Sequence, residues 1–358
     1  MLSPREAVRT LPSYHPPLVG RNGLRLDFNE NTTGCSPRVL ERLRRLSAED
    51  LTKYPEREPV EAVVAGALGI AAPELLLTNG VDEAIHLLCE TYLEGGDEAL
   101  IVVPTYSMYR IYILASGAQV LSIPAGKDFS FPGGDLCGHI TARTRLIVVA
   151  NPNNPTGTVA PLKEILRIAN SAPSAAVLVD EAYFEFYGQT VLTIRSEVPN
   201  LFVARTFSKA YGLAGLRIGV LVGAAEQMCA VRRVSSPYNV NAVALACLPE
   251  ALRDQAYIEQ YVSEVRDSRT RLERVLREFG IQFWSSQANF VLMRVGEAAA
   301  FVEQMRRRGI LVRDRSSDHA CEGCVRITLG PRAHSDRLFT ALQETLEGRG
   351  IEQGASLR

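Results

Sequence analysis

One lysine in the sequence lies where reactive chemistry is possible. Lys209 follows an apolar run, Leu201-Phe-Val-Ala204, which is typical of a buried strand. Its neighbours Ser208 and Gly212 are small, so a bulky ligand has room beside the amine, and Arg217 can reach back toward the same space. A desolvated lysine near a fixed cation has a lowered pKa, and its neutral amine can form a Schiff base. The alternative is a surface lysine in a glycine-rich loop.

A carboxylate with a similar setting lies upstream. Asp180 stands at the carboxyl end of another apolar run, Ala176-Val-Leu-Val179, and is followed by Glu-Ala-Tyr183. A buried carboxylate is costly unless a cation accompanies it, so Asp180 indicates a cationic partner or ligand. The stretch Asn151-Pro-Asn-Asn-Pro-Thr-Gly157 precedes this strand and by itself is simply a favourable turn sequence.

A third stretch, Thr78-Asn-Gly-Val-Asp-Glu83, joins an expected strand to an expected helix. The free N–H groups at a helix start, with Gly80 allowing close approach, make an anion site. Glycine-containing turns of this kind are common, so this signal is weak on its own.

In combination, these stretches resemble the fold-type I pyridoxal-phosphate aminotransferases. Asn154, Asp180 and Lys209 follow one another in the order and at the spacing of that family, and the resemblance runs from about Tyr14 to about Arg332. Within the family, the histidinol-phosphate aminotransferases are the most similar subgroup. That similarity is carried by Tyr14, by Pro237-Tyr-Asn-Val-Asn241 and by Cys324-Val-Arg-Ile-Thr328.

The resemblance implies a site for the phosphate of pyridoxal 5′-phosphate. Backbone amides near Val81 and Asp82 would hold this phosphate, with Ser208 and Arg217 as side-chain donors. Tyr54 matches a tyrosine that crosses the interface of a homodimer to the neighbouring subunit's cofactor phosphate. A plain packing role is the alternative for Tyr54.

The resemblance also assigns residues to the cofactor ring. Tyr106 would stack on the pyridine ring, and Asp180 would keep the ring nitrogen protonated so that the ring withdraws electrons. Asn154 and Tyr183 would donate hydrogen bonds to the phenolate oxygen. Lys209 would hold the cofactor as a Schiff base and then transfer a proton as a general base.

Four residues are implied to bind substrate: Tyr14, Asn239, Arg326 and Arg332. A guanidinium can fork onto either a carboxylate or a phosphate, so both arginines could serve two substrates in turn, although surface charges are the alternative. One departure from the family pattern is Thr32, which stands where a proline usually follows Asn-Glu-Asn31.

The implied reaction is a ping-pong transamination between L-histidinol phosphate with 2-oxoglutarate and imidazole-acetol phosphate with L-glutamate. Two alternatives share the fold and the cofactor residues: an aromatic amino-acid aminotransferase and a threonine-phosphate decarboxylase. A non-enzymatic, cofactor-sensing regulator would carry a DNA-binding module, and the 358 residues leave none over for one.

Composition is ordinary for a soluble globular protein, with 46% apolar and 22% charged residues and a net charge of −1. Nothing therefore points to nucleic acid or an anionic membrane as partner. The N-terminus lacks an apolar signal region and no apolar run approaches about 18 residues, so we expect a cytoplasmic protein. Among seven cysteines only Cys321 and Cys324 form a C-x-x-C pair, and we interpret them as free buried thiols rather than a redox or metal site.

Short apolar runs alternate with amphipathic segments between residues 57 and 247, which predicts an α/β fold with a mostly parallel sheet covered on both faces. Strands are expected at 75–77, 99–103, 119–123, 146–149, 176–179 and 201–203, and a helix at 81–93. A single long helix at about 250–278 should lead into a smaller α/β domain. We therefore divide the chain into an N-terminal arm (1–35), a large cofactor-binding domain (36–248) and a small domain (249–358) that part of the arm joins in space.

Overall fold

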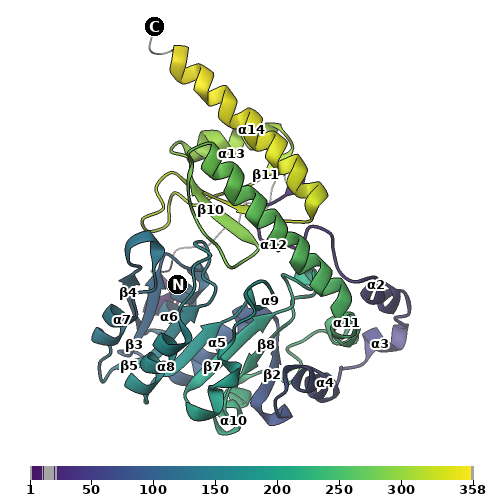
Figure 1. Ribbon diagram of the computed structural model, residues 1–358. Coiled ribbons are helices and arrows are strands. Elements are labelled where there is room, and N and C mark those ends of the chain that lie inside the picture. The colour runs from purple at the N-terminus through teal and green to yellow at the C-terminus, as the bar shows by residue number, and fades with distance from the viewer. Residues whose placement is uncertain (1, 10, 12–19, 21, 356–358) are drawn as a thin grey trace.

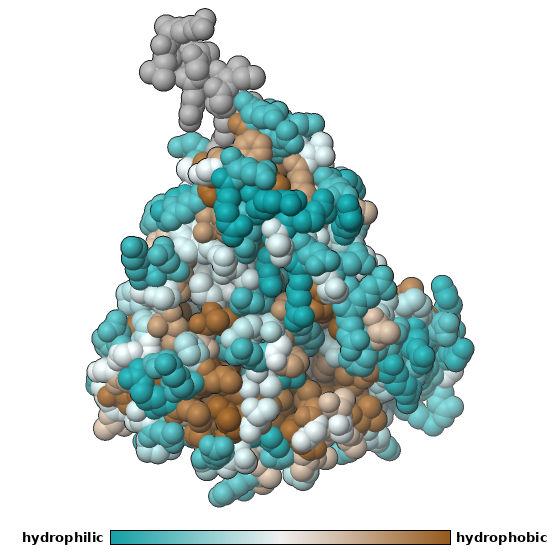
Figure 2. Space-filling model, viewed as in Figure 1, coloured by the Kyte–Doolittle hydropathy of each residue, from teal (hydrophilic) through white to brown (hydrophobic). Residues whose placement is uncertain are grey.

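The computed structural model describes residues 2–9, 11, 20 and 22–355. Figure 1 shows a broad lower body built on a large sheet and a narrower upper part that ends in a projecting helix. Tyr14 lies outside the described residues. Figure 2 shows a mostly hydrophilic surface over the upper part, whereas hydrophobic side chains gather over the lower body.

The lower body is organised by a seven-stranded sheet in the order β2-β8-β7-β6-β5-β3-β4. Only β8 runs antiparallel to its neighbours, so the prediction of a mostly parallel sheet is confirmed. All six strands expected in this region are present, whereas β8 was not predicted. The strands are β2 (Leu75–Thr78), β3 (Glu98–Val103), β4 (Gln119–Pro124), β5 (Thr144–Ala150), β6 (Ala176–Asp180), β7 (Leu201–Thr206) and β8 (Gly219–Val222).

Helices cover both faces of this sheet because alternate strand residues point to opposite sides. Leu76 and Phe202 pack with α5 (Gly80–Tyr92), α6 (Ser107–Ser116) and α10 (Ala225–Val234) on one face. Val177 and Val203 pack with α4 (Glu58–Leu68), α8 (Leu162–Ser171) and α11 (Ala242–Arg253) on the other. The candidate residues Asp180 and Lys209 lie at and just beyond the carboxyl ends of β6 and β7, where parallel sheets open toward ligands.

The upper part contains an antiparallel sheet in the order β12-β13-β10-β9. The long helix α12 (Gln255–Glu278) runs up to it from the lower body (Figure 1). From the N-terminal segment, β1 (Leu24–Arg25) pairs in parallel with β11 (Ile310–Leu311), so residues near the start of the chain complete this part. Its remaining elements are β9 (Gln282–Trp284), β10 (Phe290–Arg294), α13 (Ala298–Arg307), β12 (Arg313–Asp314), β13 (Cys324–Thr328) and α14 (Arg332–Ala355).

One element differs from the sequence prediction. The expected single helix at 250–278 is two helices, because α11 ends and α12 begins at Asp254, whose backbone leaves the helical region (φ −102°, ψ 56°). The expected start of α2 (Pro37–Arg44) is confirmed, since the Ser36 side chain accepts from the Arg38 N–H and proline occupies the first helical position. The short helices are α1 (Glu6–Arg9), α3 (Ala48–Thr52), α7 (Gly133–Gly138) and α9 (Phe184–Tyr187).

Over the described ranges, no helix is long and apolar enough to cross a membrane, and no cluster of three or more His, Cys, Asp or Glu side chains could hold a metal ion. Cys321 and Cys324 are free and buried, as the sequence predicted.

Candidate active site

Lys209 lies just beyond β7 with its side chain largely enclosed. Its Nζ donates a hydrogen bond to the Phe28 carbonyl at 3.0 Å, so the N-terminal segment passes directly over the amine. Burial, together with the positive charges of Arg326 and, less strongly, Arg217, lowers the pKa of Lys209 to about 8, although Glu30 opposes the shift. The amine pKa is therefore lowered as the sequence predicted, but Arg326 contributes more to the shift than Arg217 does.

Asp180 ends β6 and is only 5% exposed. Its Oδ2 accepts a hydrogen bond from the Tyr109 hydroxyl at 2.5 Å, and its Oδ1 accepts one from the Ala182 N–H at 2.9 Å. Neither donor is charged, and burial raises the pKa of Asp180 to about 6 despite both hydrogen bonds. The sheet thus presents a carboxylate whose charge is not compensated by its hydrogen-bond partners, which is a position suited to a cationic ligand atom.

The turn between β2 and α5 forms a cradle that only glycine permits. Gly80 has φ +74°, and a Cβ added there would lie 2.7 Å from Nη2 of Arg217. A Cβ on Gly219 would lie 3.0 Å from the Val81 nitrogen. The first turn of α5 has no side-chain cap, so its N–H groups and the Arg217 guanidinium face the same small space.

Asp82 joins this cradle to the aromatic residues of the site. Its two carboxylate oxygens accept from the Tyr106 hydroxyl at 2.9 Å and from Nη2 of Arg217 at 3.0 Å. Tyr106 in turn meets Tyr109 edge to face, with ring centroids 5.6 Å apart, and Tyr109 is the donor to Asp180. A continuous set of contacts therefore runs from the anion cradle to the buried carboxylate.

Arg326 closes the site from the upper part. Its guanidinium donates to the Asn154 side-chain oxygen and, at 2.7 Å, to the Asp27 carbonyl, and it lies 5.3 Å from the centroid of the Phe290 ring. Burial lowers the pKa of Arg326 to about 10, and Arg315 and Arg313 add to that shift.

The second predicted arginine lies elsewhere. Arg332 is the first residue of α14 and is exposed. Arg313, which the sequence analysis did not select, pairs with Arg326 across β12 and β13, and its guanidinium carbon lies 5.4 Å from the centroid of the Phe28 ring. The register between two strands brings Arg313 into position, and no local motif marks it.

Tyr183 is buried at the edge of the site and meets Phe290 edge to face at 5.1 Å. Its hydroxyl accepts a hydrogen bond from Asn29 Nδ2 at 2.9 Å, and Asn29 Oδ1 accepts one from the Thr328 hydroxyl at 3.0 Å. Asn29 has φ +57°, a left-handed conformation that asparagine tolerates better than most residues. No local motif marks Asn29, yet its side chain links the N-terminal segment to both sheets.

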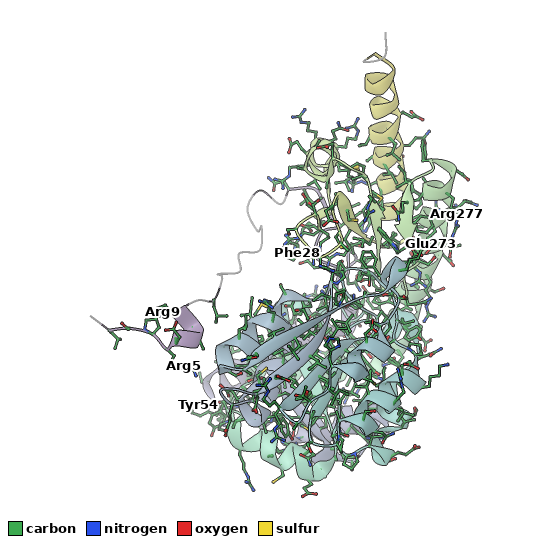
Figure 3. All side chains as sticks on the ribbon, turned by 90° about the vertical axis from the view of Figure 1, so that its left-hand side faces the viewer. Arg5, Arg9, Phe28, Tyr54, Glu273 and Arg277 are labelled. Atoms are coloured by element: carbon green, nitrogen blue, oxygen red, sulfur yellow. The ribbon has the colours of Figure 1, made fainter. Side chains whose placement is uncertain are left out.

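Tyr54 and Asn239, which were also predicted for the site, have their side chains engaged elsewhere. Tyr54 is 78% exposed and stacks on Tyr238, with centroids 4.3 Å apart, at the outer edge of the molecule (Figure 3). Asn239 donates to the Leu77 carbonyl at 3.0 Å and to Glu83 at 2.6 Å, and its own oxygen accepts from Arg57 at 2.6 Å. Asn239 thus holds Leu77 and Glu83 in place next to the anion cradle. Ser208 is buried beside Lys209, and its N–H donates to the Thr206 hydroxyl.

Together these residues can hold a flat ligand with an anion at one end and a basic ring atom at the other. The glycine cradle fits a phosphate, Tyr106 offers an aromatic face, and Asp180 lacks a charged partner of its own. Lys209 offers an amine that loses its proton near neutral pH. These requirements match a phosphorylated pyridine aldehyde.

Asp180→Asn should make the ligand-free protein more stable at neutral pH. The folded pKa of about 6 exceeds the ordinary value of 3.8, so the folded state resists ionisation. The penalty is absent below about pH 4, where the carboxyl is protonated in both states, and complete above about pH 6, where two pKa units correspond to roughly 3 kcal/mol. Asparagine can accept from the Ala182 N–H through its oxygen and donate from its NH2 group to the Tyr109 oxygen, without this penalty.

Thermal unfolding of the ligand-free protein at pH 4 and pH 7.5 measures this effect. The variant should gain stability over the original chain only at the higher pH. Asp267→Asn, at an exposed position of α12, is the matched control and should change little at either pH. A gain that is equal at both pH values would contradict an ionisation penalty at Asp180.

Comparison with known proteins agrees with this geometry. The family model for class I and II aminotransferases matches residues 21–342. A histidinol-phosphate aminotransferase of a Nostoc species is 33% identical over 352 residues, covering 96% of this chain and 98% of the relative. The crystal structure of a histidinol-phosphate aminotransferase from Sinorhizobium meliloti in complex with pyridoxal-5′-phosphate has a TM-score of 0.86 at 26% identity, covering 96% and 97% of the two chains.

A second structural neighbour is similar in fold but differs in its chemistry. The L-threonine-O-3-phosphate decarboxylase of Porphyromonas gingivalis has a TM-score of 0.77 at 26% identity and covers 90% of this chain and 99% of that one. The match of the family model over most of the chain and the full-length relatives lead to one conclusion. The chain belongs to the class I and II aminotransferases.

Proposed function

We propose that the chain is a pyridoxal-phosphate-dependent transaminase that interconverts L-histidinol phosphate and 2-oxoglutarate with imidazole-acetol phosphate and L-glutamate. The observation that carries the proposal is the uncompensated Asp180 carboxylate in one site with the low-pKa amine of Lys209. The substrate pair is proposed because full-length relatives are histidinol-phosphate aminotransferases.

Pyridoxal phosphate, when bound, supplies an aldehyde for amines and a ring that withdraws electrons from the substrate Cα. The amides of Val81 and Asp82, together with Arg217 and Ser208, would bind its phosphate. Tyr106 would offer an aromatic face to the ring. Asp180 would hold a proton at the ring nitrogen, because that proton removes the cost of the buried carboxylate charge.

Lys209 would hold the cofactor through its amine and, once released, would transfer the proton at the substrate Cα. Its pKa of about 8 is close to neutrality, so the amine can both take up and release a proton at working pH. Tyr183 and Asn154 would orient the ring through its phenolic oxygen. Their hydrogen bonds to Asn29 and Arg326 hold both side chains at the site.

Arg326 binds the substrate carboxylate as a fork, and a second arginine receives the phosphate of the larger substrate. Arg313 is favoured as that second arginine by its place beside Arg326 in the register, and Arg332 is the candidate from the family pattern. Tyr14 is proposed to contact only the imidazole phosphate substrate. Asn239 carries the same expectation from the family pattern, but its side chain is committed to Leu77, Glu83 and Arg57, so we propose that it supports the anion cradle instead.

We also propose a cytoplasmic homodimer in which Tyr54 reaches the phosphate of the neighbouring subunit. An aromatic side chain that is 78% exposed and stacked on the 55%-exposed Tyr238 is a feature that an interface would cover.

The substrate is tested by assaying glutamate with imidazole-acetol phosphate, phenylpyruvate or 4-hydroxyphenylpyruvate and comparing kcat/KM. Imidazole-acetol phosphate should be preferred by about tenfold or more, because only it presents a phosphate to the second arginine. A preference for either aromatic oxo acid would indicate an aromatic aminotransferase. Release of carbon dioxide from threonine phosphate, without transamination, would indicate the decarboxylase.

The two arginine candidates can be separated by substitution. Arg326→Ala should lower kcat/KM for both glutamate and histidinol phosphate by about 30-fold or more, since removing one partner of a buried charged hydrogen bond costs roughly 2–5 kcal/mol. Arg313→Ala should impair histidinol phosphate more than glutamate. Single-turnover measurements with each amino donor separate the two halves. A larger loss in Arg332→Ala than in Arg313→Ala would reverse this assignment.

Shared active sites can be tested by mixing inactive protomers. A Lys209→Ala protomer combined with a Tyr54→Ala protomer should regain activity, because one site of the hybrid then carries neither lesion. Lys209→Ala mixed with Asp180→Asn is the control: both residues belong to one protomer's site, so no rescue is expected. A fully active monomer in sedimentation would refute the shared site.

A further inference from the structure

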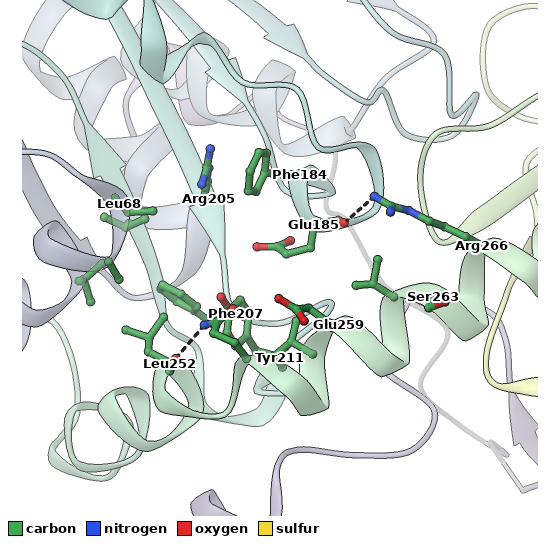
Figure 4. A pocket seen from close by; sticks show the side chains of 16 residues that line it. Leu68, Phe184, Glu185, Arg205, Phe207, Tyr211, Leu252, Glu259, Ser263 and Arg266 are labelled. Atoms are coloured by element: carbon green, nitrogen blue, oxygen red, sulfur yellow. Dashed lines mark hydrogen bonds between the residues drawn. The ribbon is translucent and has the colours of Figure 1, made fainter.

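A second cavity lies on the other side of the Lys209 loop from the anion cradle. It has a volume of about 540 Å³ and is enclosed by the sheet, α4 and the junction of α11 with α12 (Figure 4). Arg205, Phe207 and Tyr211, which lie on either side of Lys209 in sequence, form part of its wall. The residues assigned above to the cofactor and substrate are absent from its lining.

Glu185 brings to the wall of this cavity a carboxylate that no described cationic side chain pairs with. Its Oε2 is buried and has no hydrogen-bond partner among the described residues. Figure 4 shows the carboxylate pointing into the open space. Arg266 donates to the backbone carbonyls of Glu185 and Phe186, at 3.2 and 3.0 Å, rather than to that carboxylate.

Both arginines of the wall are already committed. Arg266 is held by the two backbone carbonyls, and Arg205 donates to Glu181 through Nε at 3.0 Å and Nη2 at 2.9 Å, with its guanidinium carbon 3.5 Å from the centroid of the Phe184 ring. Neither guanidinium donates a hydrogen bond to the Glu185 carboxylate. Burial accordingly raises the pKa of Glu185 to about 7, and Glu181 adds to the increase although Arg205 opposes it.

The remaining wall is largely apolar and suits an organic body. Leu68, Phe207, Leu252 and Ile258 line it, with Tyr211 and Gln255 as neutral polar groups. The volume falls within the roughly 300–1,000 Å³ typical of small-molecule sites. A metal ion is a poor fit, since the described residues hold no group of three ligating side chains.

We propose that this cavity is a second binding site, for a small organic cation whose charged nitrogen pairs with Glu185 and whose apolar body lies against Leu68, Phe207 and Ile258. A planar amidinium or guanidinium matches a carboxylate best, because two parallel N–H groups can donate to its two oxygens. The site does not depend on the proposed reaction, since none of its residues takes part in it.

Binding of a ligand in the cavity should affect the candidate active site. Glu185 belongs to α9, and Tyr183 is the residue just before the first turn of this helix. Phe207 and Tyr211, which lie on either side of Lys209 in sequence, pack edge to face with centroids 5.2 Å apart. A ligand packed against these two rings would restrict the Lys209 loop, so the cation site is placed to modulate whatever reaction Lys209 performs.

The test uses benzamidine as the probe and the cofactor-loaded protein. Benzamidine carries the required cation and does not form a Schiff base with an aldehyde, and benzamide is its neutral counterpart of nearly the same shape. Calorimetric titration should show benzamidine binding with at least tenfold higher affinity than benzamide, because only benzamidine offers a charged partner to Glu185. Equal affinities, or no detectable binding of benzamidine at about 10 mM, tenfold above a millimolar Kd, would overturn the proposal.

Glu185→Gln should lower benzamidine affinity about tenfold or more, whereas Glu259→Gln is the matched control. Glu259 lines the exposed rim of the same cavity, so water already solvates its charge and a loss under about twofold is expected. If Glu185→Gln does not fold, Ala67→Trp, which fills the mouth from α4, should abolish binding instead. Unchanged affinity in either folded variant would place benzamidine elsewhere and refute the site.

Discussion

The buried Asp180 carboxylate is the constraint on which the candidate site depends. The central strand β6 carries it to the carboxyl edge of the sheet, where burial and two neutral donors leave its charge uncompensated. A fold that keeps such a group sacrifices stability, which is expected where a binding site is built in advance for a charged ligand. The anion cradle and Tyr106 are placed to hold the other end of the ligand that we propose for Asp180.

The N-terminal segment 27–31 holds the two parts of the molecule together over this site. The Asp27 carbonyl accepts from Arg326, the Phe28 carbonyl from Lys209, and Asn31 donates to the Ala210 carbonyl. Figure 3 places Phe28 between the upper and lower parts. Thr32 stands where the family usually has a proline, and it lies against Gly330. A Cβ added to Gly330 would lie 2.2 Å from the Thr32 hydroxyl oxygen, so a glycine at 330 leaves the room that Thr32 needs.

Local patterns in the sequence predicted six of the seven strands of the large sheet, the glycine turn and the positions of Asp180 and Lys209. Each of these depends on a few neighbouring residues: an apolar run, a glycine at a helix start, a polar residue at a strand end. Tyr109, Asn29 and Arg313 were not selected because they reach the site through contacts between distant elements. The break at Asp254 was missed because charged helical spacing continues across it, whereas the backbone leaves the helical region at that residue.

Burial is the largest cause that brings the pKa values of Asp180 and Lys209 closer together. It raises the pKa of Asp180 to about 6 and lowers that of Lys209 to about 8, from ordinary values of 3.8 and 10.5. The difference between the two pKa values, more than six units in water, thus falls to about two units. Moving a proton from the Lys209 ammonium to the Asp180 carboxylate would then cost roughly 3 kcal/mol. Without burial, the same two side chains would keep pKa values close to their ordinary ones. The sheet edge, the Phe28 segment and Arg326 exclude water together, and the acid–base chemistry follows from that exclusion.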